Sequence, residues 1–132
     1  YLARVYAPDW IPKAPADEAQ VQRFLSIAAN EISNGPAAAR LVTVFGAKLD
    51  HEAAKAKAHA LFGKVENYLH NREWLVVQRP TLADVAFYSY TAHAPEGGVS
   101  LEPYPGIRAL LARIEALPGF VPMQRTRVGL AI

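Results

Sequence analysis

Asp84 is the carboxylate of this sequence that first invites a catalytic interpretation, but its spacing favours a structural one. It follows Thr81 by three residues. The Thr81 hydroxyl can accept a hydrogen bond from the amide of Asp84, while the Asp84 carboxylate reaches back to the amide of Thr81. Two donors that a buried helix end would otherwise leave unpaired are then satisfied. We therefore predict that Thr81 and Asp84 form a structural helix cap and that neither is catalytic.

The histidines and the lack of cysteine argue against several other kinds of reactive centre. None of the histidines is paired with another at metal-ligand spacing, as in a helical His-Glu-x-x-His. Without cysteine the sequence offers no thiolate nucleophile, disulfide or cysteine-based zinc site. We predict no metal site. We expect His51, His59 and His70 to face solvent on or beside one helix, and His93 to end the Thr81 helix.

Three further features leave their role open. Asn30 and Asn34 are four residues apart on a predicted long helix and share a face just before the Gly35-Pro36 step. They form either a polar surface strip that can bond a kinked backbone or part of a binding cleft. Arg23 and Arg40 either pair with nearby acidic residues or lie at a subunit contact. The Gly97-Gly98 pair lacks the strand-to-helix context of a phosphate cradle, so we predict a loop there.

Composition indicates one helical domain. The chain has 132 residues, 52% of them hydrophobic, and alanine-rich segments dominate over strand-forming runs. The net charge of +2 is spread along the chain without a basic cluster, which argues against nucleic acid and anionic membranes as partners. No apolar run approaches the roughly 20 residues of a membrane span. The cytoplasm is the default location, since nothing requires an oxidising compartment.

Apolar residues at three-and-four spacing predict an all-α bundle of about five helices. The first long helix begins near Asp17, where Asp17 and Gln20 have the form of a capping box. It is kinked or restarted at Gly35-Pro36 and ends at Gly46. Asp50 caps the next helix, which ends near Asn71. The predicted buried positions of these two segments are Val21, Phe24, Leu25, Ala28 and Ile32, and then Ala54, Ala58, Leu61, Val65, Tyr68 and Leu69.

Two further helices complete the predicted bundle. The Thr81 helix is expected to be the most buried, and a last helix runs from Pro105 to Leu117 until Pro118-Gly119 stops it. Its buried face is predicted to comprise Ile107, Leu110, Leu111 and Ile114. Residues 1–12 read as a helix end followed by a proline-rich linker that Trp10 and Ile11 anchor. Residues 120–132 lack helical periodicity and are expected to drape over the bundle.

Several segments together resemble the C-terminal domain of the cytosolic glutathione S-transferases. In that family a Ser/Thr-x-x-Asp cap opens the central helix after a short loop with a Trp-Leu pair, and a Tyr-Pro precedes a helix that ends in Pro-x-Phe. The matching segments here are Trp74-Leu75, Thr81-Leu82-Ala83-Asp84, Tyr104-Pro105 and Pro118-Gly119-Phe120. The opening Tyr1-Leu2-Ala3 resembles the end of the third helix of the family's thioredoxin-like domain, and Trp10-Ile11-Pro12 its linker. Pro80 departs from the family, which often has a larger aliphatic residue there to pack on the residue equivalent to Val85.

The resemblance implies a division of the chain and a set of partners. Residues 1–12 would be the end of the last helix of a missing N-terminal thioredoxin-like domain plus the linker, and residues 13–132 the C-terminal helical domain. Glutathione would be the co-substrate of the parent protein, with no cofactor bound by this domain alone. A small electrophilic substrate and a second identical subunit would be its other partners.

The resemblance also implies a site. The first long helix of the family's domain lines the cleft where the electrophile binds, and the corresponding residues here are Ile27, Asn30, Glu31, Asn34 and Ala38. The activating Ser, Tyr or Cys would lie in the thioredoxin-like domain, so this chain alone should be inactive. The alternative is a non-enzymatic interaction module of the same fold, as found in translation factors and synthetase-associated proteins.

Overall fold

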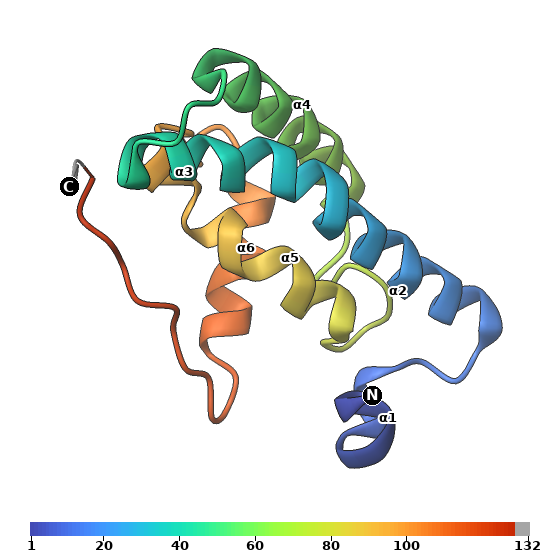
Figure 1. Cartoon of the computed structure of the whole chain (residues 1–132). Coiled ribbons are helices and arrows are strands. Elements are labelled where there is room, and N and C mark those ends of the chain that lie inside the picture. The colour runs from blue at the N-terminus through green and yellow to red at the C-terminus, as the bar shows by residue number, and fades with distance from the viewer. Residues whose placement is uncertain (129–132) are drawn as a thin grey trace.

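The computed structural model describes residues 1–128, and every regular element in that range is helical. In chain order they are α1 (Leu2–Tyr6), η1 (Pro8–Trp10), α2 (Pro15–Ile27), η2 (Ala28–Ala37), α3 (Ala38–Phe45), α4 (His51–Leu69), α5 (Leu82–Ala92), η3 (Ala94–Gly97) and α6 (Pro105–Glu115). The predicted all-α bundle is therefore confirmed (Figure 1). None of the helices within residues 1–128 is both long and apolar enough to cross a membrane.

The first long helix differs from the prediction at its start and at its middle. It begins at Pro15 with Ala14 as N-cap, because proline at the first helical position has a suitable φ and needs no amide partner. Asp17 lies inside the first turn, so the predicted cap there is wrong. At Gly35-Pro36, where a kink or restart was predicted, the backbone stays helical through η2, a ten-residue π-helix that contains Pro36, and α-helical structure resumes at Ala38.

The π-helix explains how proline is accommodated inside the helix. Proline lacks an amide and clashes with the carbonyl four residues earlier in a regular α-helix. A π-helix bonds each amide to the carbonyl five residues earlier, as the amide of Ala38 does to Ser33 at the end of η2. The wider turn lets α2, η2 and α3 run on as one long rod, which Figure 1 shows along the bundle.

Several predicted helix ends are confirmed. Gly46 ends α3 in the left-handed conformation, with φ of 67°. Asp50 caps α4, and its side chain accepts from the amide of Ala53 at 2.9 Å. Asn71, just past the end of α4, also has a positive φ, of 65°. The last helix ends at Glu115, slightly before the predicted Leu117.

The predicted capping box at the start of α5 is present and does more than cap the helix. Oδ2 of Asp84 accepts from the amide of Thr81 at 2.8 Å and from its hydroxyl at 3.1 Å. The other carboxylate oxygen accepts from the amide of Leu75 at 3.0 Å. The single carboxylate therefore ties the loop after α4 to the first turn of α5, and Leu75 is fully buried as a result.

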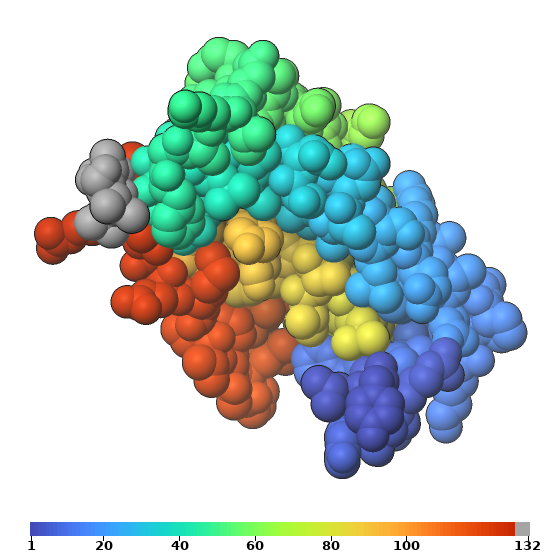
Figure 2. Space-filling view, in the orientation of Figure 1, coloured from blue at the N-terminus to red at the C-terminus, as the bar shows by residue number. Residues whose placement is uncertain are grey.

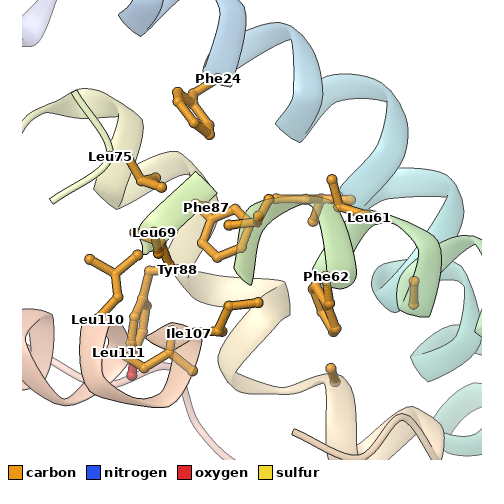
Figure 3. Close-up of a cluster of buried hydrophobic side chains, with 14 of the residues drawn as sticks. Phe24, Leu61, Phe62, Leu69, Leu75, Phe87, Tyr88, Ile107, Leu110 and Leu111 are labelled. Carbon is orange, nitrogen blue, oxygen red and sulfur yellow. The ribbon is translucent and has the colours of Figure 1, made fainter. Parts of the chain in front are cut away.

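The core forms where α2, α4, α5 and α6 converge, as Figure 3 shows. Phe62 of α4, which the sequence pattern did not single out, packs edge-on against Phe87 of α5, with ring centroids 6.5 Å apart. The predicted face of α6 is buried throughout. The predicted faces of α2 and α4 are buried except for three residues that are only half-buried, Leu25, Ala28 and Tyr68.

The N-terminal residues and residues 120–128 lie on the surface of this bundle. Trp10 and Ile11 are half-buried and Pro12 is buried, so the linker is anchored as predicted. Gly119, with φ of 77°, turns the chain after α6. Residues 120–128 then run without helical structure along the bundle (Figure 1), as predicted. Residues 129–132, which the same prediction included, are outside the described residues.

A pair of glycine substitutions tests how tightly η3 packs on α3. A Cβ at Gly97 would lie 2.6 Å from the amide nitrogen of Arg40, so we expect Gly97→Ala to lower the free energy of unfolding by about 2 kcal/mol or more. Gly63 lies inside α4, and a Cβ there would meet nothing within 4 Å, so Gly63→Ala should raise it by roughly 0.5–1 kcal/mol. Urea denaturation of both variants measures the two effects, and a harmless Gly97→Ala would contradict the close packing.

A second pair of substitutions compares the caps of α5 and α4. Asp84→Ala leaves the buried amides of Leu75 and Thr81 without an acceptor, so we expect a loss of about 3 kcal/mol. Asp50→Ala removes one exposed cap bond and should cost only about 1 kcal/mol. Thermal denaturation gives the ranking. Equal losses in the two variants would mean that the bond to Leu75 adds nothing.

Candidate functional site

An open groove of about 630 Å³ separates the α2–η2 rod from α4, and we call it the α2–α4 groove. Phe24, Leu61 and Val65 give it an apolar floor, and polar side chains stand at its rim. The full set of lining residues is Arg23, Phe24, Ser26, Ile27, Asn30, Glu31, Leu61, Lys64, Val65 and Tyr68. It therefore combines aromatic surface with charges of both signs.

The predicted cleft residues are distributed unevenly around this groove. Ile27, Asn30 and Glu31 line it. Asn34 joins them indirectly, because its Nδ2 donates to both the backbone oxygen and the Oδ1 of Asn30, each at 3.0 Å. Ala38 opens α3, is half-buried and is not among the residues that line the groove. The structure thus brings four of the five predicted residues together and leaves Ala38 apart.

Arg23 and its neighbours make one end of the groove positively charged. The Arg23 guanidinium lies 5.9 Å from the ring centroids of both Phe24 and Tyr68. The Arg72 guanidinium lies 4.6 Å from the centroid of the Tyr68 ring, and Lys64 also lines the groove. Within residues 1–128 no carboxylate pairs with Arg23, whose one side-chain bond is a long one to Gln20. This end can therefore hold a polar or negatively charged group.

A second groove, of about 410 Å³, lies between α5, α6 and the C-terminal segment, and we call it the α5–α6 groove. Figure 2 shows the hollow between the red C-terminal residues and the dark blue N-terminal ones, beside the yellow atoms of α5. Its walls are mainly apolar. The lining residues are Trp10, Pro80, Asp84, Val85, Tyr88, Ser89, Ile114, Leu117, Pro118, Gly119, Phe120, Val121, Pro122 and Met123.

The two ionisable groups of the α5–α6 groove are both engaged within the fold. The Tyr88 hydroxyl donates to Oε1 of Glu115 at 2.8 Å. Burial, reinforced by the Glu115 carboxylate, raises the pKa of Tyr88 to about 12, so this phenol stays protonated at neutral pH. Burial also raises the pKa of Asp84, although the donors from Leu75 and Thr81 oppose the shift. Neither group is arranged to activate a nucleophile.

The histidines are less exposed than predicted. A ring nitrogen of His51 lies 2.8 Å from the carbonyl oxygen of Gly97, and one of His59 lies 2.8 Å from the hydroxyl of Tyr104. Both are half-buried because α4 packs against η3 and against the residue that precedes α6, while His70 is exposed as expected. His93 follows α5 as predicted. In residues 1–128 no three His, Asp or Glu side chains gather closely enough to hold a metal ion.

A buried polar cluster that the sequence did not reveal joins α3, η3 and the C-terminal segment. Glu96 lies at its centre, with Oε2 bonded to Nε of Arg40 at 2.5 Å and Oε1 2.8 Å from Nδ1 of His93. Burial alone would raise the pKa of Glu96, but the bonds from His93, Arg40 and the amide of Thr126 outweigh it and hold the pKa below its ordinary value. Of the two alternatives for Arg40, the structure therefore shows pairing with an acidic residue, Glu96.

Comparisons of the sequence and of the fold with known proteins point to the same family. Residues 41–118 match the family described as "Glutathione S-transferase, C-terminal domain". The structure resembles a glutathione S-transferase from Xanthobacter autotrophicus, with a TM-score of 0.79 and 25% identity over 86% of this chain and 58% of that one. A glutathione S-transferase from Pseudomonas fluorescens gives 0.79 and 28%, over 86% of this chain and 59% of that one.

A third structure shares the fold. The theta class glutathione S-transferase from Xanthomonas axonopodis pv. citri, solved with glutathione bound, has a TM-score of 0.75 and 24% identity, over 89% of this chain and 59% of that one. This chain thus spans less than two thirds of each of these proteins. The comparison with curated proteins found no match. Because the family match covers more than half of its residues, the chain belongs to the glutathione S-transferase C-terminal domain family.

Proposed function

We propose that this chain is the helical part of a glutathione transferase that joins glutathione to a small electrophile. In such a reaction the thiolate sulfur forms a bond to the electrophilic carbon, and the leaving group departs with the electron pair of the bond that breaks. The family match over residues 41–118 carries the proposal. The glutathione-bound relative of the same fold supports glutathione as the thiol.

The proposal assigns activation of the thiol to a preceding thioredoxin-like domain, through a Ser, Tyr or Cys. In this chain Tyr88 and Asp84 are engaged in structural hydrogen bonds, which supports that assignment. Residues 1–12 would then be the end of the last helix of that domain and the linker, and residues 13–132 the helical domain.

Exposed apolar side chains around α1 support a covering domain. Tyr1, Leu2 and Tyr6 are 88%, 71% and 74% exposed, and Val85 on the facing part of α5 is 48% exposed. A shallow apolar hollow joins these elements; it is lined by Leu2, Ala3, Tyr6, Ala7, Trp10, Leu82 and Val85. Side chains of this kind favour burial against another surface.

In this proposal, residues of α2, η2 and the start of α3 line the side of the cleft where the electrophile binds. Ile27 and the linked amides of Asn30 and Asn34 offer apolar contact and hydrogen bonds, with Glu31 beside them and Ala38 one turn further on. Homodimer contacts are the second role that we propose for this domain. The proposed location of the protein is the cytoplasm. The α2–α4 groove is open between its two walls, so a second subunit could reach the same residues.

Assay of the full-length parent protein tests the proposed activity. We expect retention on immobilised glutathione and conjugation of chlorodinitrobenzene, followed by the absorbance of the product. The chain of residues 1–132 alone should show neither, because the thiol-activating residue lies outside it. A parent protein that is not retained and does not turn over would instead support a non-enzymatic interaction module of the same fold.

A double variant tests the predicted cleft residues in the same parent protein. Removing both amides in Asn30→Ala/Asn34→Ala should raise KM for the electrophile about three- to tenfold with little change in kcat, because roughly one hydrogen bond to the substrate is lost. Asn67→Ala, on the exposed side of α4, is the matched control and should leave KM unchanged. Unaltered turnover and affinity, with a changed oligomeric state by light scattering, would make the groove a subunit contact.

A further inference from the structure

The C-terminal segment, residues 120–128, is held to the bundle at two points. Near its start the ring of Phe120 packs edge-on against Tyr88 of α5, with centroids 5.2 Å apart. Near its far end Thr126 enters the buried cluster around Glu96. The Thr126 amide donates to Oε1 of Glu96 at 3.2 Å, and its hydroxyl accepts from Nη2 of Arg40 at 3.0 Å.

Between these two points the segment is free of hydrogen bonds. Among the described residues, none of 121–125 donates or accepts a hydrogen bond to the bundle. Arg125 and Arg127 are exposed, while Thr126 between them is half-buried. Gly119, in the left-handed conformation, stands where the segment leaves α6, and such a turn can absorb a change of chain direction.

The cluster that receives Thr126 is densely hydrogen-bonded and largely cut off from water. The side chains of Arg40 and Glu96 are only 9% and 13% exposed. The carbonyl of Glu96 accepts from the hydroxyl of Thr43 at 2.6 Å, and its carboxylate is also bonded to His93. Because hydrogen bonds to buried charged groups are stronger than those between neutral groups, the contact with Thr126 is a firm attachment of the segment.

We propose that residues 120–128 form a strap, that Arg40 and Glu96 latch it through Thr126, and that opening the latch removes one wall of the α5–α6 groove. Phe120, Val121, Pro122 and Met123 of the strap are one wall of that groove. Lifting the strap removes this wall and exposes Tyr88 and the end of α6, while the core beneath α5 stays packed. The latch does not depend on transferase activity.

Trypsin provides a direct measure of the open form, because Arg125 and Arg127 flank the latch residue. Cleavage requires an extended, accessible chain, and its rate follows the population of the open form when the strap opens and closes quickly. In Thr126→Val the hydroxyl is lost at nearly constant size. We expect cleavage after Arg125 and Arg127, identified by mass spectrometry, to be about tenfold faster than in the wild type.

The controls separate latch opening from protease preference and from global unfolding. Rates are divided by those of the peptide 118–128 with the same substitution. Thr126→Ser keeps the hydroxyl and should restore slow cleavage. Cleavage after Arg72, exposed beyond the end of α4, should be the same in all variants.

Glu96→Gln removes the charge at the centre of the cluster and should also speed cleavage of the strap. If that variant does not fold, Thr126→Val alone decides. Normalised cleavage of Thr126→Val at the wild-type rate would overturn the latch, as would equal rates for the Val and Ser variants.

Discussion

The Asp84 carboxylate is the contact on which the arrangement of this domain depends. It accepts three hydrogen bonds, two from Thr81 at the start of α5 and one from Leu75 in the preceding loop. The loop between α4 and α5 lacks regular structure, and this acceptor fixes its path into the core together with the hydroxyl of Tyr68, which donates to the carbonyl of Leu75 at 2.7 Å. Burying a charge is costly, and the raised pKa of Asp84 reflects that cost. This cost is offset because, without the carboxylate, the buried amides of Leu75 and Thr81 would lack an acceptor.

Signals that lie within a few residues of one another could be read from the sequence. The caps at Thr81 and Asp50, the glycine at the end of α3 and the buried face of α6 all depend on local spacing, and the structure confirms them. The two prolines of the first long helix were harder to place: its start was predicted near Asp17 rather than at Pro15, and the π-helix around Pro36 was not foreseen. One of them starts a helix and the other is accommodated inside it.

Contacts between distant residues could not be predicted in this way. The first amides of α6, those of Gly106 and Ile107, are capped by Glu66 of α4, at 2.7 and 2.9 Å. The cluster of Arg40, Glu96 and Thr126 likewise unites three segments that are far apart in the sequence. No pattern along the chain predicts either arrangement, because each partner is of a residue type that usually lies on the surface. Only the packing of the helices brings the partners together. Of the candidate site, the shared face of Asn30 and Asn34 follows from helix spacing, whereas Ile27 and Glu31 were assigned through the family resemblance; which side of the rod they face depends on how α4 packs.

The π-helix η2 has a further consequence for how the rod can change. A π turn contains more residues than an α turn, so the angle between α2 and α3 around the common axis depends on how far η2 extends. Conversion of η2 to α-helical bonding would rotate α3 relative to α2 and carry Arg40 out of line with Glu96. It would also move Gly35 away from Ala58, whose backbone lies so close that there is little room for a side chain. The length of η2 therefore sets the rotation of α3 relative to α2 about the common axis. The loss or gain of a single residue in η2 would change which residues of α2 and of α3 face the bundle.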